Sequence, residues 1–122
     1  MGNIELVVQG TATDVRGFTE LAQRMCAFVE ANEPGTLRYD CFADADSGRF
    51  LWQEVYGSEN ALLQHLQHLA ENRFMDEAAQ VAEFEAMTAL GDIGDPDVHR
   101  WLAESGTPAL RHVTGAARRP SQ

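Results

Sequence analysis

The side chain best suited to chemistry in this sequence is His65, which lies in a segment with the periodicity of an amphipathic helix. Leu62, Leu66 and Leu69 recur at helical spacing after Ser58, a residue type that caps helix N-termini. This spacing places His65 at the edge of the apolar stripe. An imidazole has an ordinary pKa of about 6.5, so a modestly buried one stays neutral at pH 7 and accepts a proton. His65 is therefore a candidate general base; the alternative is a structural histidine bonded to a backbone carbonyl.

His68 shares a helix face with His65, because residues three apart on a helix are neighbours. Such a pair supplies two of the nitrogen ligands that zinc accepts. Two ligands are too few to hold the ion. We therefore expect no metal site.

Three aromatic residues, Tyr39, Trp52 and Phe74, are candidates to contact a flat substrate. Tyr39 and Trp52 lie in residues 36–43 and 49–56, whose length and aromatic and aliphatic content predict strands. Large aromatic side chains also pack in cores and dimer interfaces. This alternative stays open for each of them.

Charged residues interrupt the same strands at Arg38, Asp40 and Glu54. A buried charge is usually paired, so we expect Arg38 to meet Glu54 across the strands or across a dimer. The sharper hypothesis is that Arg38 binds a substrate anion.

Turn residues join the two strands at residues 44–48. This joint starts like a calcium loop, but Arg49 stands where such a loop needs glycine and Val55 where it needs glutamate. A hairpin turn is the better interpretation.

The other elements follow from caps and periodicity. We expect a strand at residues 4–11, a helix from the Asp14 cap to about residue 31, and a fourth strand at 81–90. Residues 71–80 fit the end of the second helix and one further turn. Asp95 and Pro96 then begin a short helix, and residues 109–114 fit a short edge strand. The predicted organisation is one domain of residues 1–94, its extension at 95–114, and a disordered tail at 115–122.

Several short motifs in this order resemble the antibiotic biosynthesis monooxygenase family. They are an E-P-G-x-L-R-Y segment, a D-x-D-x-x-R-F turn, a strand ending E-x-Y and an A-L-x-x-H-L helix. The matching residues are Glu33, Pro34, Gly35, Leu37, Arg38, Tyr39, Asp44, Asp46, Arg49, Phe50, Glu54, Tyr56, Ala61, Leu62, His65 and Leu66.

The resemblance implies an α+β, ferredoxin-like βαββαβ fold with an antiparallel sheet that pairs into a dimeric α/β barrel. It implies oxidation of a small aromatic phenol or quinol by dioxygen without a cofactor, with His65 as base. Tyr39, Trp52, Arg38 and Phe74 would then contact the substrate. Two alternatives stay open: a haem-binding or haem-degrading relative, and a non-catalytic binding protein of the same fold.

The composition of the chain argues against several kinds of partner and site. The formal net charge is −10, and all nine basic residues are arginine. The acidic balance argues against nucleic acid, and the absence of lysine excludes a Schiff-base or Walker lysine. No apolar run reaches the length of a membrane span and no signal pattern opens the chain, so we expect a cytoplasmic protein that does not bind membranes. The resemblance implies that it is a homodimer. Cys26 and Cys41 fit buried thiols better than a disulfide.

Overall fold

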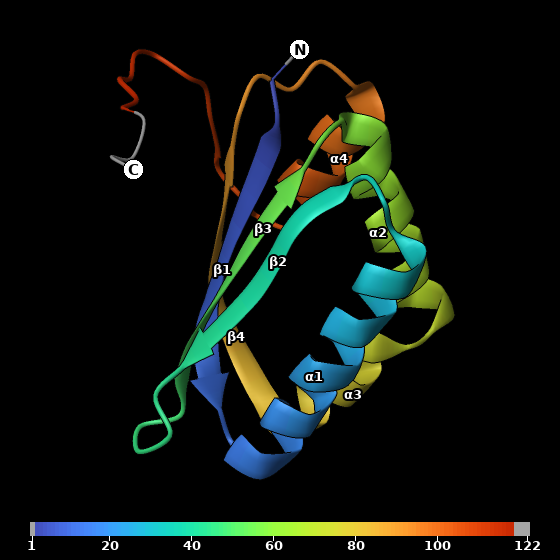
Figure 1. Ribbon diagram of the computed structural model, residues 1–122, viewed down its shortest axis with the longest axis vertical. Helices are drawn as coiled ribbons and strands as arrows, with labels where there is room; N and C mark the ends of the chain where they lie inside the picture. The colour runs from blue at the N-terminus through green and yellow to red at the C-terminus, as the bar shows by residue number, and fades with distance from the viewer. Residues whose placement is uncertain (1, 119–122) are drawn as a thin grey trace.

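The computed structural model describes residues 2–118, in which one sheet is covered on one face by helices (Figure 1). The strands pair in the order β2-β3-β1-β4-β5, and the β4–β5 pair alone is parallel in this described range. The elements are β1 (Ile4–Ala12), α1 (Val15–Asn32), β2 (Thr36–Ala43), β3 (Arg49–Tyr56), α2 (Glu59–Glu71), α3 (Phe74–Val81), β4 (Ala82–Leu90), α4 (Pro96–Glu104) and β5 (Ala109–Leu110).

This arrangement confirms the ferredoxin-like α+β fold. The order β2-β3-β1-β4 is that of a βαββαβ unit, and the fourth strand lies where alternation predicts it. The sheet is mixed, because the predicted edge strand is reduced to β5, which pairs in parallel with β4. Residues 111–118 contain no helix or strand, and the last four positions of the expected tail lie outside the described residues.

The helices begin at the predicted caps. The Asp14 carboxylate accepts a hydrogen bond from the Gly17 N–H, and the Ser58 hydroxyl oxygen accepts one from the Ala61 N–H. Each bond satisfies a backbone donor that the first helical turn leaves without a partner. Residues 71–80 differ from the expectation, because Arg73 adopts a left-handed backbone (φ 57°) and separates α2 from a distinct helix, α3.

Strand β3 decides which side chains face the helices. Phe50, Trp52, Glu54 and Tyr56 alternate with partly exposed residues and are all buried. Successive strand residues point to opposite faces. One carboxylate, that of Glu54, is therefore carried into the space between sheet and helices by the same alternation that buries its aromatic neighbours.

The C-terminal extension packs on the same core. Val98 and Leu102 of α4 are buried against Leu6 of β1 and Leu62 of α2 in one of two core clusters. The other cluster gathers Phe18, Phe50, Trp52 and their neighbours beneath α1 and α3. Cys26 and Cys41 are free thiols, as predicted. Within residues 2–118 no helix has the length and apolarity needed to cross a membrane.

Candidate active site

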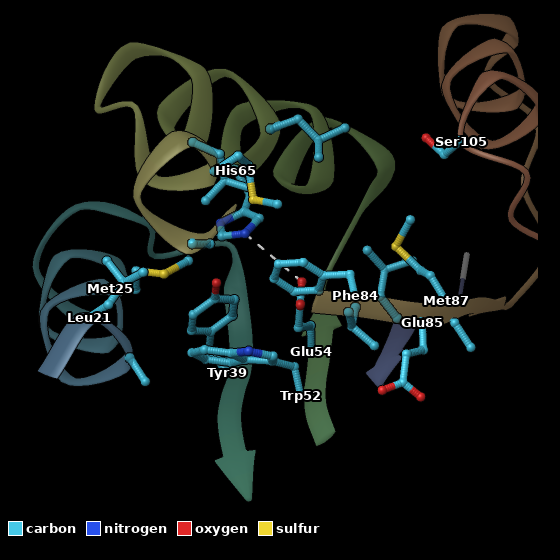
Figure 2. Close-up of a pocket in the computed structure, with 18 of the residues that line it drawn as sticks. Leu21, Met25, Tyr39, Trp52, Glu54, His65, Phe84, Glu85, Met87 and Ser105 are labelled. Carbon is cyan, nitrogen blue, oxygen red and sulfur yellow. Dashed lines mark ion pairs between the residues drawn. The ribbon is translucent and has the colours of Figure 1, made fainter. Parts of the chain in front are cut away.

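A cavity of about 730 Å³ lies between the helices and the sheet, and its wall draws residues from both core clusters. Most of the wall is apolar. Polar side chains are few, and two of them, Glu54 and His65, lie at its inner end (Figure 2). An apolar hollow with a few convergent polar groups is the usual form of a small-molecule site.

The two ring nitrogens of His65 have different surroundings: Nδ1 is held by Glu33, whereas Nε2 lies toward Glu54 and the cavity. Its side chain is 2 % exposed, and its Nδ1 lies 2.9 Å from Oε1 of Glu33. The carboxylate accepts, so Nδ1 carries the proton and donates, which leaves the lone pair on Nε2. Nε2 lies 3.9 Å from Oε1 of Glu54, and Figure 2 shows the two groups pointing toward one another. The basic nitrogen, Nε2, therefore faces Glu54, which lines the cavity.

Glu33 is a buried acceptor for three side chains. It follows the last residue of α1 and is 3 % exposed. Its Oε1 accepts from the Thr36 hydroxyl (2.8 Å) as well as from His65, and its Oε2 lies 2.9 Å from Nδ1 of His68. A buried carboxylate with several donors is well satisfied. Glu33 thus fixes the tautomer and orientation of His65.

Glu54 is the second carboxylate beside the imidazole. It is 6 % exposed. This burial, together with the nearby charge of Glu33, raises the pKa of Glu54 to about 7. The Tyr56 hydroxyl, which donates to Oε1 of Glu54 over 2.5 Å, works in the opposite direction. A carboxyl with this pKa exchanges protons near neutrality. Glu54 is therefore a candidate to donate or accept a proton beside His65.

Burial has the opposite effect on His65, because desolvation disfavours a charged imidazole. It lowers the pKa of His65, although the charge and hydrogen bond of Glu33 oppose the shift. The imidazole is consequently neutral at pH 7. It is ready to accept a proton.

Two aromatic residues form the floor beside these groups. The Tyr39 ring centroid lies 5.0 Å from that of His65 and 4.8 Å from that of Trp52. In Figure 2 the Tyr39 hydroxyl is directed toward His65. Burial, with the nearby Glu54 charge, holds the pKa of Tyr39 well above its usual value, so this hydroxyl remains a donor.

Comparison with known proteins identifies the fold's relatives. The family model for antibiotic biosynthesis monooxygenases matches residues 10–87, the part of the chain that carries His65, Glu33 and Glu54. The chain belongs to this family. The expected resemblance is therefore confirmed. No match is found among curated proteins.

Solved structures share the fold of this family member at low identity. MupZ from Pseudomonas fluorescens is 21% identical with a TM-score of 0.75, over 97% of this chain and 96% of MupZ. SnoaB from Streptomyces nogalater, described as a cofactor-independent oxygenase, is 15% identical with a TM-score of 0.65, over 79% and 98%. PA3566 from Pseudomonas aeruginosa is 20% identical with a TM-score of 0.63, over 77% and 97%.

The structure brings three of the five predicted site residues together. His65, Tyr39 and Trp52 all line the cavity. Phe74 is instead buried in the core, edge-on to Phe28 at a centroid distance of 5.7 Å. It is absent from the cavity wall because it begins α3 with its ring directed into the packing between helices.

Arg38 does not meet Glu54 across the strands, and that part of the expectation is wrong. In the β2–β3 register Arg38 pairs with Val55, whereas Tyr39 pairs with Glu54. Directly paired residues share a face of the sheet, so Arg38 and Glu54 lie on opposite faces. Arg38 forms an ion pair with Asp40 (2.9 Å) and is largely exposed. It does not line the cavity around His65.

His65 and His68 converge on a carboxylate and not on a metal. Both Nδ1 atoms contact Glu33, at 2.9 Å each. Within residues 2–118, no group of three or more His, Cys, Asp or Glu side chains has an arrangement that could hold a metal ion. Of the ring nitrogens of His65 and His68, Nε2 of His65 faces the cavity. An organic ligand in the cavity would therefore meet this atom.

Sequence reasoning missed two contributors to the site. The sequence indicates Glu33 only as the first residue of the E-P-G-x-L-R-Y segment, because its contact with His65 joins residues 32 positions apart. Trp101 of α4 lines the cavity from outside the matched family region. For Glu54, by contrast, a signal was present: its alternation with Phe50, Trp52 and Tyr56 predicts a common face.

Proposed function

We propose that this chain is a cofactor-independent monooxygenase that oxidises a small aromatic phenol, quinol or anthrone-like compound with dioxygen. The observation that carries the proposal is the placement of His65, whose Nδ1 is held by Glu33 and whose Nε2 faces an apolar cavity of about 730 Å³. Membership of the antibiotic biosynthesis monooxygenase family supports the reaction class.

Proton removal is the first step. His65 Nε2 takes a proton from the phenol, or from the acidic methylene of an anthrone. The imidazolium that forms lies against the Glu33 carboxylate, 2.9 Å from Nδ1. A charge-assisted hydrogen bond of this kind is about twice as strong as a neutral one. Glu33 therefore stabilises the charged product of the proton transfer more than the neutral starting state.

Oxidation of the resulting anion needs no further reagent. An electron-rich phenolate or carbanion passes an electron to dioxygen, and the two radicals combine to a substrate peroxide. The imidazolium of His65 protonates the peroxide anion. His65 then removes the second C–H proton while Glu54 protonates the departing oxygen, so water leaves and a new carbonyl remains. The proton on His65 finally passes to the Glu54 carboxylate, which restores both residues. The substrate loses two hydrogens and gains one oxygen, the second oxygen leaves as water, and all four electrons accepted by dioxygen come from the substrate.

Glu54 returns a proton in the last step. Its pKa of about 7 leaves part of the carboxyl protonated at neutral pH, and it lies beside His65 on the cavity wall. A general acid with a pKa near the working pH transfers protons efficiently in both directions. The departing oxygen of the peroxide thereby leaves as water and not as hydroxide.

The aromatic floor orients the substrate. Tyr39 and Trp52 offer ring surface next to His65. A flat ring stacked there has its edge toward Nε2, and the surrounding apolar residues exclude water. Stacking of aromatic pairs contributes about 0.5–1.5 kcal/mol beyond area burial.

The same proposal includes a homodimer formed through the open face of the sheet. Leu51 and Val55 alternate with the buried residues of β3 and thus face away from the helices. Phe42 pairs with Leu51 in the β2–β3 register and is 56% exposed. Figure 1 shows this face without helices over it. Apolar residues on an open sheet face favour burial against a second copy.

Oxygen uptake tests the function. Wild-type protein is mixed with a panel of quinols and 1,8-dihydroxyanthrone, and oxygen consumption is followed with an electrode. We expect His65→Ala to lower the rate by about 10²–10⁴-fold, the usual contribution of a general base. His112→Ala, at an exposed histidine outside the cavity, serves as the matched control.

The same measurement separates the alternatives. A non-catalytic binding protein would bind these compounds without oxygen uptake, and equal rates in wild type and His65→Ala would leave His65 a structural residue. Haemin is added in a parallel experiment. A Soret shift that depends on His65 would favour the haem-binding alternative over the oxygenase.

A further inference from the structure

We infer that the cavity selects substrates that carry no negative charge and discriminates against aromatic carboxylates. This inference rests on the proposed function, because it assumes that the ligand lies beside His65. It concerns a property that the motifs around His65 do not specify: the net charge of the molecule that enters.

Within the part of the chain that the structure describes, the cavity wall contains acidic side chains but no lysine or arginine. The titratable side chains of this wall are Tyr39, Glu54, His65 and Glu85. The sequence contains no lysine. An entering carboxylate would therefore find no cationic side chain of the kind that pairs buried anions.

Six of the nine arginines of this chain are engaged in ion pairs away from the cavity. They form ion pairs with acidic partners at the surface, namely Arg16, Arg24, Arg38, Arg73, Arg100 and Arg111. Arg38, the side chain that the sequence offered for anion binding, forms an ion pair with Asp40 and lies on the opposite face of the sheet from Glu54. None of these six is part of the wall around His65.

His65 does not supply the missing positive charge. Its burial keeps the imidazole neutral, and its one N–H is already donated to Glu33. A substrate anion placed beside Nε2 would meet the lone pair of that nitrogen. It would also lie near the Glu54 carboxyl, whose Oε1 is 3.9 Å from Nε2. Once Glu54 is ionised, like charges in a poorly solvated site repel strongly.

Neutral oxygen atoms, in contrast, find suitable partners. The Tyr39 hydroxyl remains protonated and is directed toward His65, so it donates to a ketone or phenol oxygen (Figure 2). The acidic proton of a phenol meets Nε2. At an exposed position of the wall, the Glu85 carboxylate accepts a hydrogen bond from the Thr11 hydroxyl and points away from His65, which adds a second acidic group to the wall (Figure 2). The wall thus suits an uncharged aromatic molecule that becomes an anion only when His65 removes its proton.

Three matched ligands test the inference: 2-naphthol, 6-hydroxy-2-naphthoate and its methyl ester. The ester is larger than the acid but neutral, so it separates charge from size. Affinities are measured by calorimetry at pH 8, where Glu54 is ionised. We expect naphthol and ester to bind with similar affinity and the carboxylate at least about 30-fold more weakly, a difference typical of one unpaired buried charge.

Two variants locate the cause. Glu54→Gln removes the inner charge at nearly constant shape, and we expect the ester-to-acid ratio to fall at least threefold. Glu85→Gln is the outer control, with a smaller change in the ratio. An unchanged ratio in Glu54→Gln would contradict the part assigned to Glu54.

The outcomes distinguish this inference from the function on which it rests. A carboxylate that binds as tightly as the ester overturns charge selection and leaves the oxygenase proposal standing. Failure of all three compounds to bind overturns the cavity as a substrate site, and charge selection falls with it.

Discussion

The Nδ1 atom of His65 lies 2.9 Å from Oε1 of Glu33, although 32 positions separate the two residues in the chain. Helix α1 ends just before Glu33, and helix α2 carries His65 above the sheet. The end of α1 therefore meets the middle of α2, and His68 and Thr36 also contact the same carboxylate. A histidine at the edge of an apolar stripe thereby becomes an oriented base.

Replacing Glu33 tests this orientation. Glu33→Gln removes the charge that raises the pKa of His65, so the acidic limb of the rate profile should move to lower pH while the plateau rate falls by about 10-fold or more. The pH–rate profile of oxygen uptake measures both effects. Glu33→Asp should restore part of the plateau, whereas a purely structural role would change stability and leave the limb in place.

Glu54 makes stability depend on pH in a definite direction. Its pKa is raised from 4.5 to about 7 in the folded chain, so the native state binds the proton more tightly than the unfolded state. Its contribution is complete below pH 4.5 and is lost as the pH rises through 7. The full amount is about 3 kcal/mol, from 1.36 kcal/mol per pKa unit.

Denaturant unfolding of wild type and Glu54→Gln between pH 4.5 and 8 measures this contribution. The difference between the two proteins isolates Glu54, since the lowered pKa of His65 acts in the opposite direction in both. Glu54→Gln should gain stability relative to wild type as the pH rises. A difference that stays constant with pH would show that Glu54 is not the buried acid described above.

Trp101 should limit the size of the substrate. It lines the cavity from α4, while Val98 and Leu102 on the same helix are anchored in the core. Trp101→Ala should widen the cavity and lower KM for bulkier phenols by about 10-fold relative to small ones. Arg100→Ala, on the exposed face of the same helix, is the control. Equal changes for small and bulky substrates would remove Trp101 from the site.

The open sheet face predicts the oligomeric state. Sedimentation should give a dimer for wild type and a folded monomer for Val55→Arg, because an arginine among Phe42, Leu51 and Val55 opposes burial of that face. Gln64→Arg, at an exposed position of α2, should remain dimeric. A wild-type monomer at micromolar concentration would contradict the proposed dimer.

Local patterns predicted most of the elements and the part of the site formed by His65, Tyr39 and Trp52. The apolar spacing around His65 and the alternation through Trp52 and Glu54 are local signals, and the structure preserves both. The caps at Asp14, Ser58 and Asp95 were visible for the same reason, since a cap depends on residues two or three positions away.

Long-range pairing explains what the sequence could not predict. Arg38 is separated from Glu54 by the register of β2 on β3, which shifts between Thr36 and Arg38. The contact of Glu33 with His65 depends on how the end of α1 lies against the middle of α2 over the sheet. The position of Phe74 depends on the left-handed turn at Arg73, a break that no proline or glycine announces.

Deprotonation of a bound substrate tests the central claim most directly. 1,8-Dihydroxyanthrone is mixed without oxygen at pH 7.5 with wild type, His65→Gln and the control His112→Ala, and the absorbance of its anion is recorded. We predict the anion spectrum with wild type and the control, and the neutral spectrum with His65→Gln. The same anion in all three proteins, or no anion with wild type, would contradict the assignment of His65 as the base.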